Sequence, residues 1–157
     1  MRVGWITFTC SEDSTVLFLE LLNKNFFDWS GKIDFVYCNA LKKSSDVFSL
    51  RDIDVFFIEG AISTDDEKKK LEYIRSISKY IVTIGACACT GMPSAQRNFF
   101  DDRTKAEIRP RIEKFGLLNE VLPVTKLVKV DDMVMGCPMD EKSFIRVLNK
   151  YFEIFRV

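Results

Sequence analysis

Three cysteines stand where apolar stretches of this chain end. Cys10 closes the first stretch, Cys87 follows the apolar run 81–84, and Cys137 lies between a glycine and a proline. Parallel sheets bind ligands beyond the carboxyl ends of their strands, so thiols from separate strands can meet at one edge. Thiolates are strong ligands for iron and zinc. The three positions therefore suggest a metal site.

The spacing of these thiols favours an iron–sulfur cluster over zinc. Closing a loop of about 77 residues between Cys10 and Cys87 costs about 4 kcal/mol, so only a folded sheet can bring them together. Zinc ribbons and bacterial ferredoxins draw ligands from local C-x-x-C turns, which this chain lacks. The chain also has no histidine, which removes the commonest zinc ligand and the usual general base.

Two acidic residues lie near the expected site, and each has two interpretations. Asp13 follows Cys10 by three residues; in one interpretation Asp13 or Ser14 caps a helix, and in the other Asp13 serves as a ligand. Glu59 ends an apolar strand level with Cys10, where its carboxylate is either solvated or part of the site. Cys38 lies in a neighbouring strand without a motif, and we expect it only to pack.

The strands and helices that position these side chains can be predicted from hydrophobic periodicity. Thr64 and Glu67 form a capping box at the start of one helix, and Pro110 should interrupt any long helix in the polar segment 94–111. That segment is either a solvated flap or a surface that docks on a partner, and 42–46 is a polar loop. The expected strands span 2–9, 33–38, 54–58, 81–84 and 127–130, and the expected helices span 14–27, 64–79 and 140–155.

This alternation predicts one α/β domain over residues 1–157, a three-layer α/β/α fold like flavodoxin with a mainly parallel sheet.

The composition bears on partners and location. Lys plus Arg and Asp plus Glu number 23 each, so no net charge favours nucleic acid or an anionic membrane. No membrane span or signal peptide is apparent, and five cysteines suit a reducing compartment, so we expect a cytoplasmic protein. Part of the surplus among the 14 phenylalanines is expected at a subunit interface.

The order of these motifs resembles the small subunit of nickel–iron hydrogenases and the related twenty-kilodalton iron–sulfur subunit of NADH:quinone oxidoreductase. The resemblance covers nearly the whole chain and rests on Cys10, the strand end Glu59-Gly60, the segment 85–93 and the segment 136–138. It implies one proximal [4Fe–4S] cluster beside a large subunit that holds a nickel–iron centre. Cys10, Cys87 and Cys137 would then be three of the ligands, in an electron-transfer subunit that performs no bond chemistry itself.

The chain departs from the family pattern after the first strand. The family usually has C-x-x-C there, whereas aspartate takes the second place here, as in deazaflavin-reducing hydrogenase small subunits. The resemblance thus implies Asp13 as the fourth ligand. A different alignment equates Cys10 with the second cysteine and leaves Thr7 in the first place, and Glu59 or Cys89 would then complete the site. The paired adjacent cysteines of the quinone oxidoreductase branch are absent, which favours the hydrogenase side.

The resemblance also implies partners. No cysteine-rich extension with further clusters follows, so electrons are expected to pass between the hydrogenase large subunit and a further iron–sulfur or flavin electron-transfer subunit. The alternatives are the corresponding iron–sulfur subunit of a quinone oxidoreductase-like complex, a flavin-binding domain, and a cluster-free interaction subunit. The first loop lacks the Ser, Thr and Gly donors that would hold a flavin phosphate.

Overall fold

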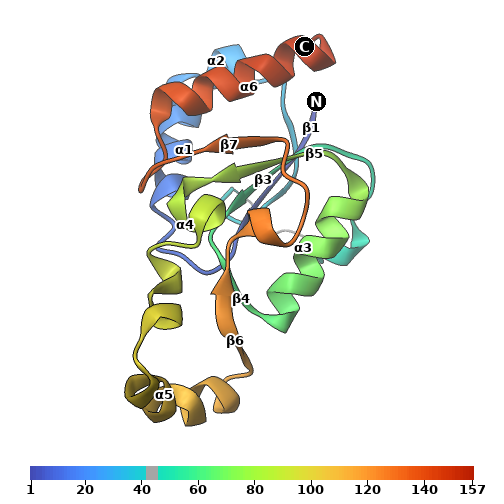
Figure 1. Cartoon of the computed structure of the whole chain (residues 1–157). Coiled ribbons are helices and arrows are strands. Elements are labelled where there is room, and N and C mark those ends of the chain that lie inside the picture. Colours follow the sequence, from blue (N-terminus) through green and yellow to red (C-terminus); the bar gives the residue numbers. More distant parts are fainter. Residues whose placement is uncertain (42–45) are drawn as a thin grey trace.

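A five-stranded sheet lies at the centre of the computed structural model, which describes residues 1–41 and 46–157 (Figure 1). All neighbouring strands are parallel, in the order β2-β1-β3-β5-β7. This is the flavodoxin-like order, in which the chain changes direction between β1 and β3 and ligands bind beyond the strand ends at that point. The strands are β1 (Arg2–Thr7), β2 (Asp34–Cys38), β3 (Ile53–Glu59), β5 (Ser78–Ile84) and β7 (Asp132–Val134).

Helices cover both faces of the sheet, so the expected three-layer α/β/α fold is confirmed. The helices α1 (Asp13–Lys24) and α6 (Glu141–Phe155) pack on one face, against side chains that include Trp5 and Phe57. The helix α3 (Asp65–Ile77) packs on the other face, against Ile6, Phe56 and Ile58. Successive strand residues point to opposite faces, and both faces are apolar, as expected for a sheet buried between helices.

Several local predictions are confirmed. The Thr64 hydroxyl accepts from the Glu67 N–H (3.1 Å), and the Glu67 carboxylate accepts from the Thr64 N–H (3.0 Å), which completes the capping box of α3. The helix α6 begins after Asp140 and buries the expected side chains Phe144, Val147, Leu148 and Tyr151. A short helix α2 (Phe26–Trp29) follows α1, and a 3₁₀ turn η1 (Val47–Ser49) precedes β3. Residues 42–45 of the expected loop lie outside the described residues.

Two predictions about the second half of the chain are wrong. The fifth strand is β7, not 127–130, because those residues continue from the turn η3 (Val124–Lys126), where the N–H groups of Leu127 and Val128 bond to the Val124 carbonyl. Pro110 does not end a helix, since α5 (Asp102–Lys114) continues through it. Pro110 is exposed on α5, where water can reach the backbone carbonyl that loses its N–H donor.

Residues 94–122 form an arm that leads away from the central sheet. It comprises the 3₁₀ segment η2 (Ser94–Phe99), α5 and β6 (Leu117–Leu122), a strand not expected from the sequence. The strand β6 pairs antiparallel with β4 (Ile62–Thr64) in a separate two-stranded sheet. In Figure 1 the helix α5 lies at the end of this arm, and none of its residues is buried. No helix within the described ranges is long and apolar enough to cross a membrane.

Candidate metal centre

One small cavity lies at the carboxyl ends of β1, β3, β5 and β7. Of the predicted site residues, Cys10, Asp13, Cys87 and Cys137 all line it, together with Glu59. The fold thus brings together three thiols from widely separated parts of the sequence. The cavity itself has a volume of only about 10 Å³. Its remaining lining residues are Ser11, Ser14, Ile84, Gly85, Ala86 and Gly136.

The sulfurs of Cys10 and Cys87 each accept a hydrogen bond. The backbone N–H of Glu12 donates to Cys10 Sγ (3.3 Å), and the Ser94 hydroxyl donates to Cys87 Sγ (3.2 Å). Cys10 is half-buried, and this burial raises the pKa of its thiol to about 12, which the negative charges of Glu59 and Cys87 reinforce. The thiol therefore keeps its proton at neutral pH unless a metal supplies the compensating positive charge.

The loop that carries Cys137 depends on a glycine. Gly136 has φ +121°, and a Cβ built there would lie 2.4 Å from the carbonyl oxygen of Pro138, so no larger residue fits. The Gly136 carbonyl accepts from the N–H of Ala86 (2.7 Å), which ties this loop to the helix α4 (Gly85–Thr90) that carries Cys87. Cys137 itself is exposed, so the site opens to the surface.

Glu59 is buried and stabilises the start of α1. Its two carboxylate oxygens accept from the backbone N–H groups of Ser14 and Thr15, each at 3.0 Å, and one also accepts from the Thr15 hydroxyl (2.5 Å). These are unsatisfied donors at a helix N-terminus, where a negative charge is favourable. The N-cap position is held by Glu12, whose side chain makes no capping bond. The interpretation of Asp13 as the helix cap is therefore wrong.

The side chains of Asp13 and Cys89 have different surroundings. Asp13 is the first residue of α1, is exposed, and accepts one hydrogen bond from the Ser11 hydroxyl (2.7 Å). Cys89 lies on α4, but it does not line the cavity. Its Sγ lies 3.3 Å from the Thr83 hydroxyl, and burial raises the pKa of this thiol. Cys38 is fully buried in the core on the side of the sheet that α1 and α6 cover.

Two serines that hold the site together were not expected to do so. The Ser94 hydroxyl lies within hydrogen-bond distance of both Cys87 Sγ (3.2 Å) and the carbonyl oxygen of Thr9 (3.1 Å), which share its single proton, and the Ser14 hydroxyl accepts from the N–H of Met139 (3.1 Å). The contacts with Thr9 and Met139 join parts of the chain that are distant in sequence. Serine is common in loops and at helix starts, so no sequence signal distinguishes these two from solvated ones.

The donor set fits a cluster better than a single ion. Within residues 1–41 and 46–157, no three Cys, Asp or Glu side chains are arranged to hold one metal ion. The ligands of a [4Fe–4S] cluster each bind a different iron, so they need to lie farther apart than the ligands of one ion. Soft thiolates that accept hydrogen bonds are the usual ligands of such clusters. The cavity interior holds about one water, so a cluster would need the open side beside Asp13 and Cys137.

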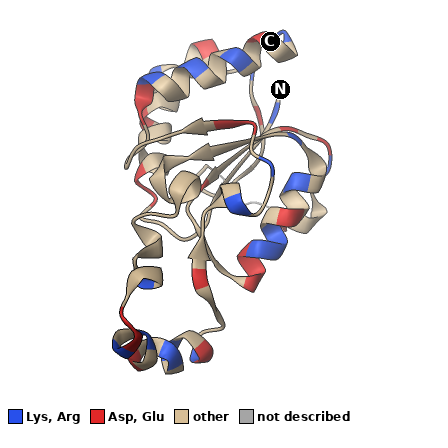
Figure 2. Cartoon of the chain, in the orientation of Figure 1, with Lys and Arg blue, Asp and Glu red and all other residues tan. Residues whose placement is uncertain are grey.

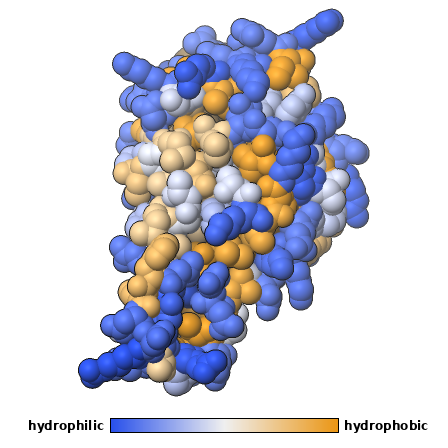
Figure 3. Space-filling view, viewed as in Figure 1, coloured by the Kyte–Doolittle hydropathy of each residue, from blue (hydrophilic) through white to orange (hydrophobic). Residues whose placement is uncertain are grey.

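The site is bordered by uncharged surface on the side of α4 and β7, and by the exposed acidic residues Glu12 and Asp13 on the side of α1. In Figure 2 the Lys, Arg, Asp and Glu residues gather on α3, α5 and α6, whereas α4 and the end of β7 are uncharged. Figure 3 shows weakly hydrophobic surface across the middle of this face, between the charged helices α6 and α5. Met92, Met133 and Met135 are exposed on segments that adjoin the site.

Comparison with known proteins gives the family. Residues 13–151 match the model of the NADH ubiquinone oxidoreductase 20 kDa subunit family. The chain is 28% identical over 109 residues to the NAD-reducing hydrogenase HoxS subunit delta of Cupriavidus necator, covering 59% of this chain and 52% of that protein. It is 30% identical over 107 residues to the coenzyme F420 hydrogenase subunit gamma of Methanosarcina barkeri, covering 67% and 36%. The matches thus span about half the length, or less, of these curated relatives.

Solved structures share the fold. A chain of an NAD⁺-reducing [NiFe]-hydrogenase superposes with a TM-score of 0.78 at 21% identity, covering 95% of this chain and 89% of that one. A chain of the Ni-Fe-Se hydrogenase from Desulfomicrobium baculatum superposes with a TM-score of 0.63 at 17% identity, covering 94% and 60%. The family match covers most of the chain, and the motif order agrees with it. The protein belongs to the NADH ubiquinone oxidoreductase 20 kDa subunit family.

Proposed function

We propose that this protein is an electron-transfer subunit of a cytoplasmic hydrogenase-type oxidoreductase and that it carries one [4Fe–4S] cluster. The observation that carries the proposal is the cavity lined by Cys10, Cys87 and Cys137, three thiols distant in sequence. Relatives named as hydrogenase subunits support the reaction class. A bound cluster would supply one-electron redox chemistry, and the protein would supply its ligands, its position and its insulation from water.

Each residue of the site has a separate role in this proposal. Cys10, Cys87 and Cys137 are ligands, and the hydrogen bonds from Glu12 N–H and the Ser94 hydroxyl lower the electron density on two of the sulfurs. Hydrogen bonds to cluster sulfurs and solvent exposure are among the factors that set the reduction potential. A change in these hydrogen bonds would therefore alter the reduction potential of the cluster while its ligands stay the same.

We assign the fourth ligand to Asp13. The carboxylate of Glu59 is already bonded to three donors of α1, and the Cys89 thiol lies outside the cavity beside Thr83. Asp13 lines the cavity and is exposed, and within the described part of the chain its side chain is bonded to one serine hydroxyl, so rotation of the side chain breaks one hydrogen bond. Carboxylate is a harder ligand than thiolate, which makes the iron that it binds more exchangeable.

The proposal includes two partners. A large subunit with a nickel–iron active site would cover the surface beside the exposed Cys137, and a further iron–sulfur or flavin subunit would exchange electrons with the cluster. The uncharged surface around α4 supports such a contact, because depletion of charge marks the core of protein interfaces. A quinone oxidoreductase-like complex is the second candidate, favoured by the family model itself.

The test compares two cysteines on the same short helix. Iron and acid-labile sulfide are measured in anaerobically purified wild type, in Cys87→Ala and in Cys89→Ala. We expect wild type and Cys89→Ala to hold a cluster with its broad visible absorption, and Cys87→Ala to lose or convert it. Equal iron content in the two variants would disprove the assignment. Resolved flavin bands would instead support a flavin domain, and wild type without iron or flavin would support a cluster-free subunit.

A further inference from the structure

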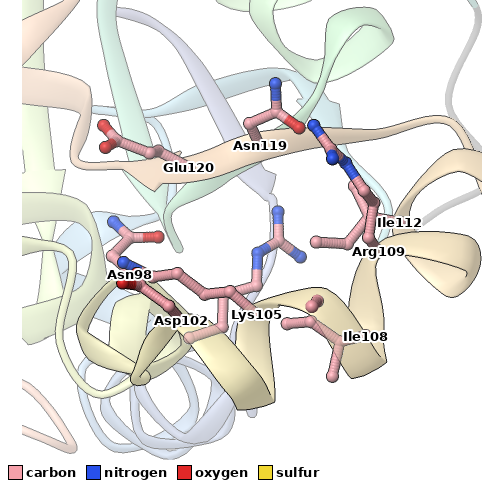
Figure 4. Close-up of a pocket in the computed structure, with 10 residues that line it drawn as sticks. Asn98, Asp102, Lys105, Ile108, Arg109, Ile112, Asn119 and Glu120 are labelled. Atoms are coloured by element: carbon pink, nitrogen blue, oxygen red, sulfur yellow. The ribbon is translucent and has the colours of Figure 1, made fainter.

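A second and larger cavity lies in the arm, away from the cysteine site. It has a volume of about 380 Å³ and is enclosed by η2, α5 and β6 (Figure 4). Cavities of about 300–1,000 Å³ are typical of sites for small molecules. None of the proposed cluster ligands lines it, so the electron-transfer role does not account for it.

Basic side chains outnumber acidic ones around this cavity. Arg97, Lys105 and Arg109 line it, against Asp102 and Glu120. Among the described residues, Lys105, Asp102 and Glu120 take part in no ion pair. Arg109 pairs only with Glu113 on its own helix, at 3.7 Å and with both side chains exposed. An exposed pair of this kind contributes little, so Arg109 can exchange its partner for a ligand at small cost.

Arg97 is a partly desolvated cation that forms no ion pair with any other described residue. It is half-buried and donates to the carbonyl oxygen of Leu118 on β6, while its Nε is buried without a hydrogen-bond partner within the described part of the chain. Burial lowers the pKa of its guanidinium, although arginine remains charged at neutral pH. The Nε of Arg97 lacks the hydrogen-bond acceptor that water would otherwise supply, so an anion beside this partly desolvated guanidinium would be stabilising.

The remaining lining residues indicate which chemical groups, besides an anionic one, the ligand should have. Ile108 and Ile112 give α5 an apolar side toward the cavity. In Figure 4 the carboxylates of Asp102 and Glu120 lie on one side of the cavity, and the guanidinium of Arg109 lies on the other. Carboxylates without partners accept hydrogen bonds from N–H and O–H groups. A ligand that fits both sides has an anionic group at one end and donor groups at the other.

We propose that the arm cavity binds a small organic anion, with its phosphate or carboxylate held by Arg97, Lys105 and Arg109 and its amino or hydroxyl groups directed to Asp102 and Glu120. Arginine forks and ammonium groups bind both kinds of anion. This site is separate from the cysteine cavity, and its occupancy does not require a cluster.

Three small amines that differ at one end serve as probes. The full-length chain is titrated calorimetrically with O-phosphoethanolamine, β-alanine and ethanolamine, which place a phosphate, a carboxylate or a hydroxyl opposite the same amino group. We expect O-phosphoethanolamine or β-alanine to bind with a dissociation constant of about 1 mM or tighter, and ethanolamine to bind at least about tenfold more weakly. The tighter of the first two probes identifies the anionic group.

Arg109→Gln and Lys105→Gln should each weaken binding of the preferred probe about tenfold, because each removes one charged hydrogen bond. Arg103→Gln is the matched control, since Arg103 lies on the same helix, pairs with Glu107 and does not line the cavity. Arg97→Gln would also remove the hydrogen bond to Leu118 on β6. The proposal is therefore tested with the variants of the exposed residues Lys105 and Arg109. No binding of any probe, or equal binding by wild type, Arg109→Gln and Lys105→Gln, would overturn the proposal and leave the cavity to an acidic side chain of a partner protein.

Discussion

The side chains that line the cysteine cavity divide into residues that hold the fold and residues available to a ligand. Glu59 belongs to the first group, because three donors of α1 occupy its carboxylate. Asp13 belongs to the second, because among the described residues only Ser11 forms a hydrogen bond with its carboxylate. The two carboxylates should therefore respond differently to the loss of their charge.

The variants Asp13→Asn and Asp13→Cys test whether Asp13 is the fourth ligand of the cluster. Asparagine keeps the shape of aspartate but is neutral, so Asp13→Asn should lose iron or leave an incomplete cluster. Cysteine supplies an anionic thiolate in the same place, so Asp13→Cys should keep four irons with an altered reduction potential and spectrum. Iron content, electron paramagnetic resonance and redox titration measure these changes. Four irons and an unchanged potential in Asp13→Asn would show that Asp13 is not a ligand.

Glu59→Gln should destabilise the fold and leave the ligands in place. The glutamine amide still accepts one N–H of α1, but its NH₂ group faces the second, so a buried donor loses its partner. We expect the free energy of unfolding to fall by about 1–3 kcal/mol in a urea titration at neutral pH. Glu12→Gln is the control, because the exposed Glu12 side chain makes no capping bond on the same helix. An equal effect of both substitutions would contradict this account.

At the scale of elements, the loops that carry the thiols are fixed by backbone contacts. The N–H of Ala86 bonds to the carbonyl of Gly136. Thr9, the residue before Cys10, exchanges two backbone hydrogen bonds with Ala61. The strand ends and loops are thus joined by hydrogen bonds that do not involve the thiols. A substitution that moves one loop should disturb the site even where every ligand remains.

Gly136→Ala is that substitution, and Gly31→Ala is its control. Both glycines have positive φ, so both variants carry the strain of alanine in the left-handed region, about 1 kcal/mol. Only at Gly136 would the new Cβ also meet backbone atoms, at 2.4 Å from Pro138 and 2.9 Å from Asp140, whereas nothing lies within 4 Å of it at Gly31. Urea titration should show the larger loss for Gly136→Ala, with reduced iron content for this variant alone. Normal iron content in Gly136→Ala would show that the loop does not control the site.

Sequence patterns predicted the elements that are buried on both faces and the residues at their ends. The strands β1, β3 and β5 are apolar along most of their length, so their position and the thiol or carboxylate that follows each could be predicted. The strand β6 could not, because Asn119 and Glu120 are exposed within it and its partner β4 is short. The hydrogen bond between Ser94 and Cys87 also escaped prediction, since it depends on how η2 folds back over α4.

For the whole molecule, charge is distributed unevenly although the totals balance. Charged residues cover α3, α5 and α6, and α4 and the end of β7 are uncharged, while the acidic Glu12 and Asp13 are exposed on the other side of the cysteine cavity (Figures 2 and 3). Exposed methionines adjoin the site, and methionine is enriched in protein interfaces. The strand β7 is also an edge strand, so its outer side is not paired within the described sheet. These features favour this face for the docking of the proposed partner.

Met135→Lys should separate partner binding from cluster binding. Met135 is 47% exposed and lies between β7 and Cys137, so a lysine there places a charge beside the site without disturbing the core. A charge desolvated at an interface without a partner is costly, so the amount of copurifying protein should fall at least about tenfold. Quantitative mass spectrometry of affinity-purified wild type and variant measures this, and iron content should stay unchanged.

Phe27→Lys provides the comparison. Phe27 is 92% exposed on α2, which follows the carboxyl end of α1 and therefore lies at the opposite end of the sheet from the cavity. If docking occurs at the cysteine face, Phe27→Lys retains the proteins that copurify with wild type, and Met135→Lys loses them. The reverse result would move the interface to α2. A cluster in the cysteine cavity would then be about a helix length, roughly 15–20 Å, farther from the partner. Electron transfer between the cluster and the partner's active site would in that case need a further carrier.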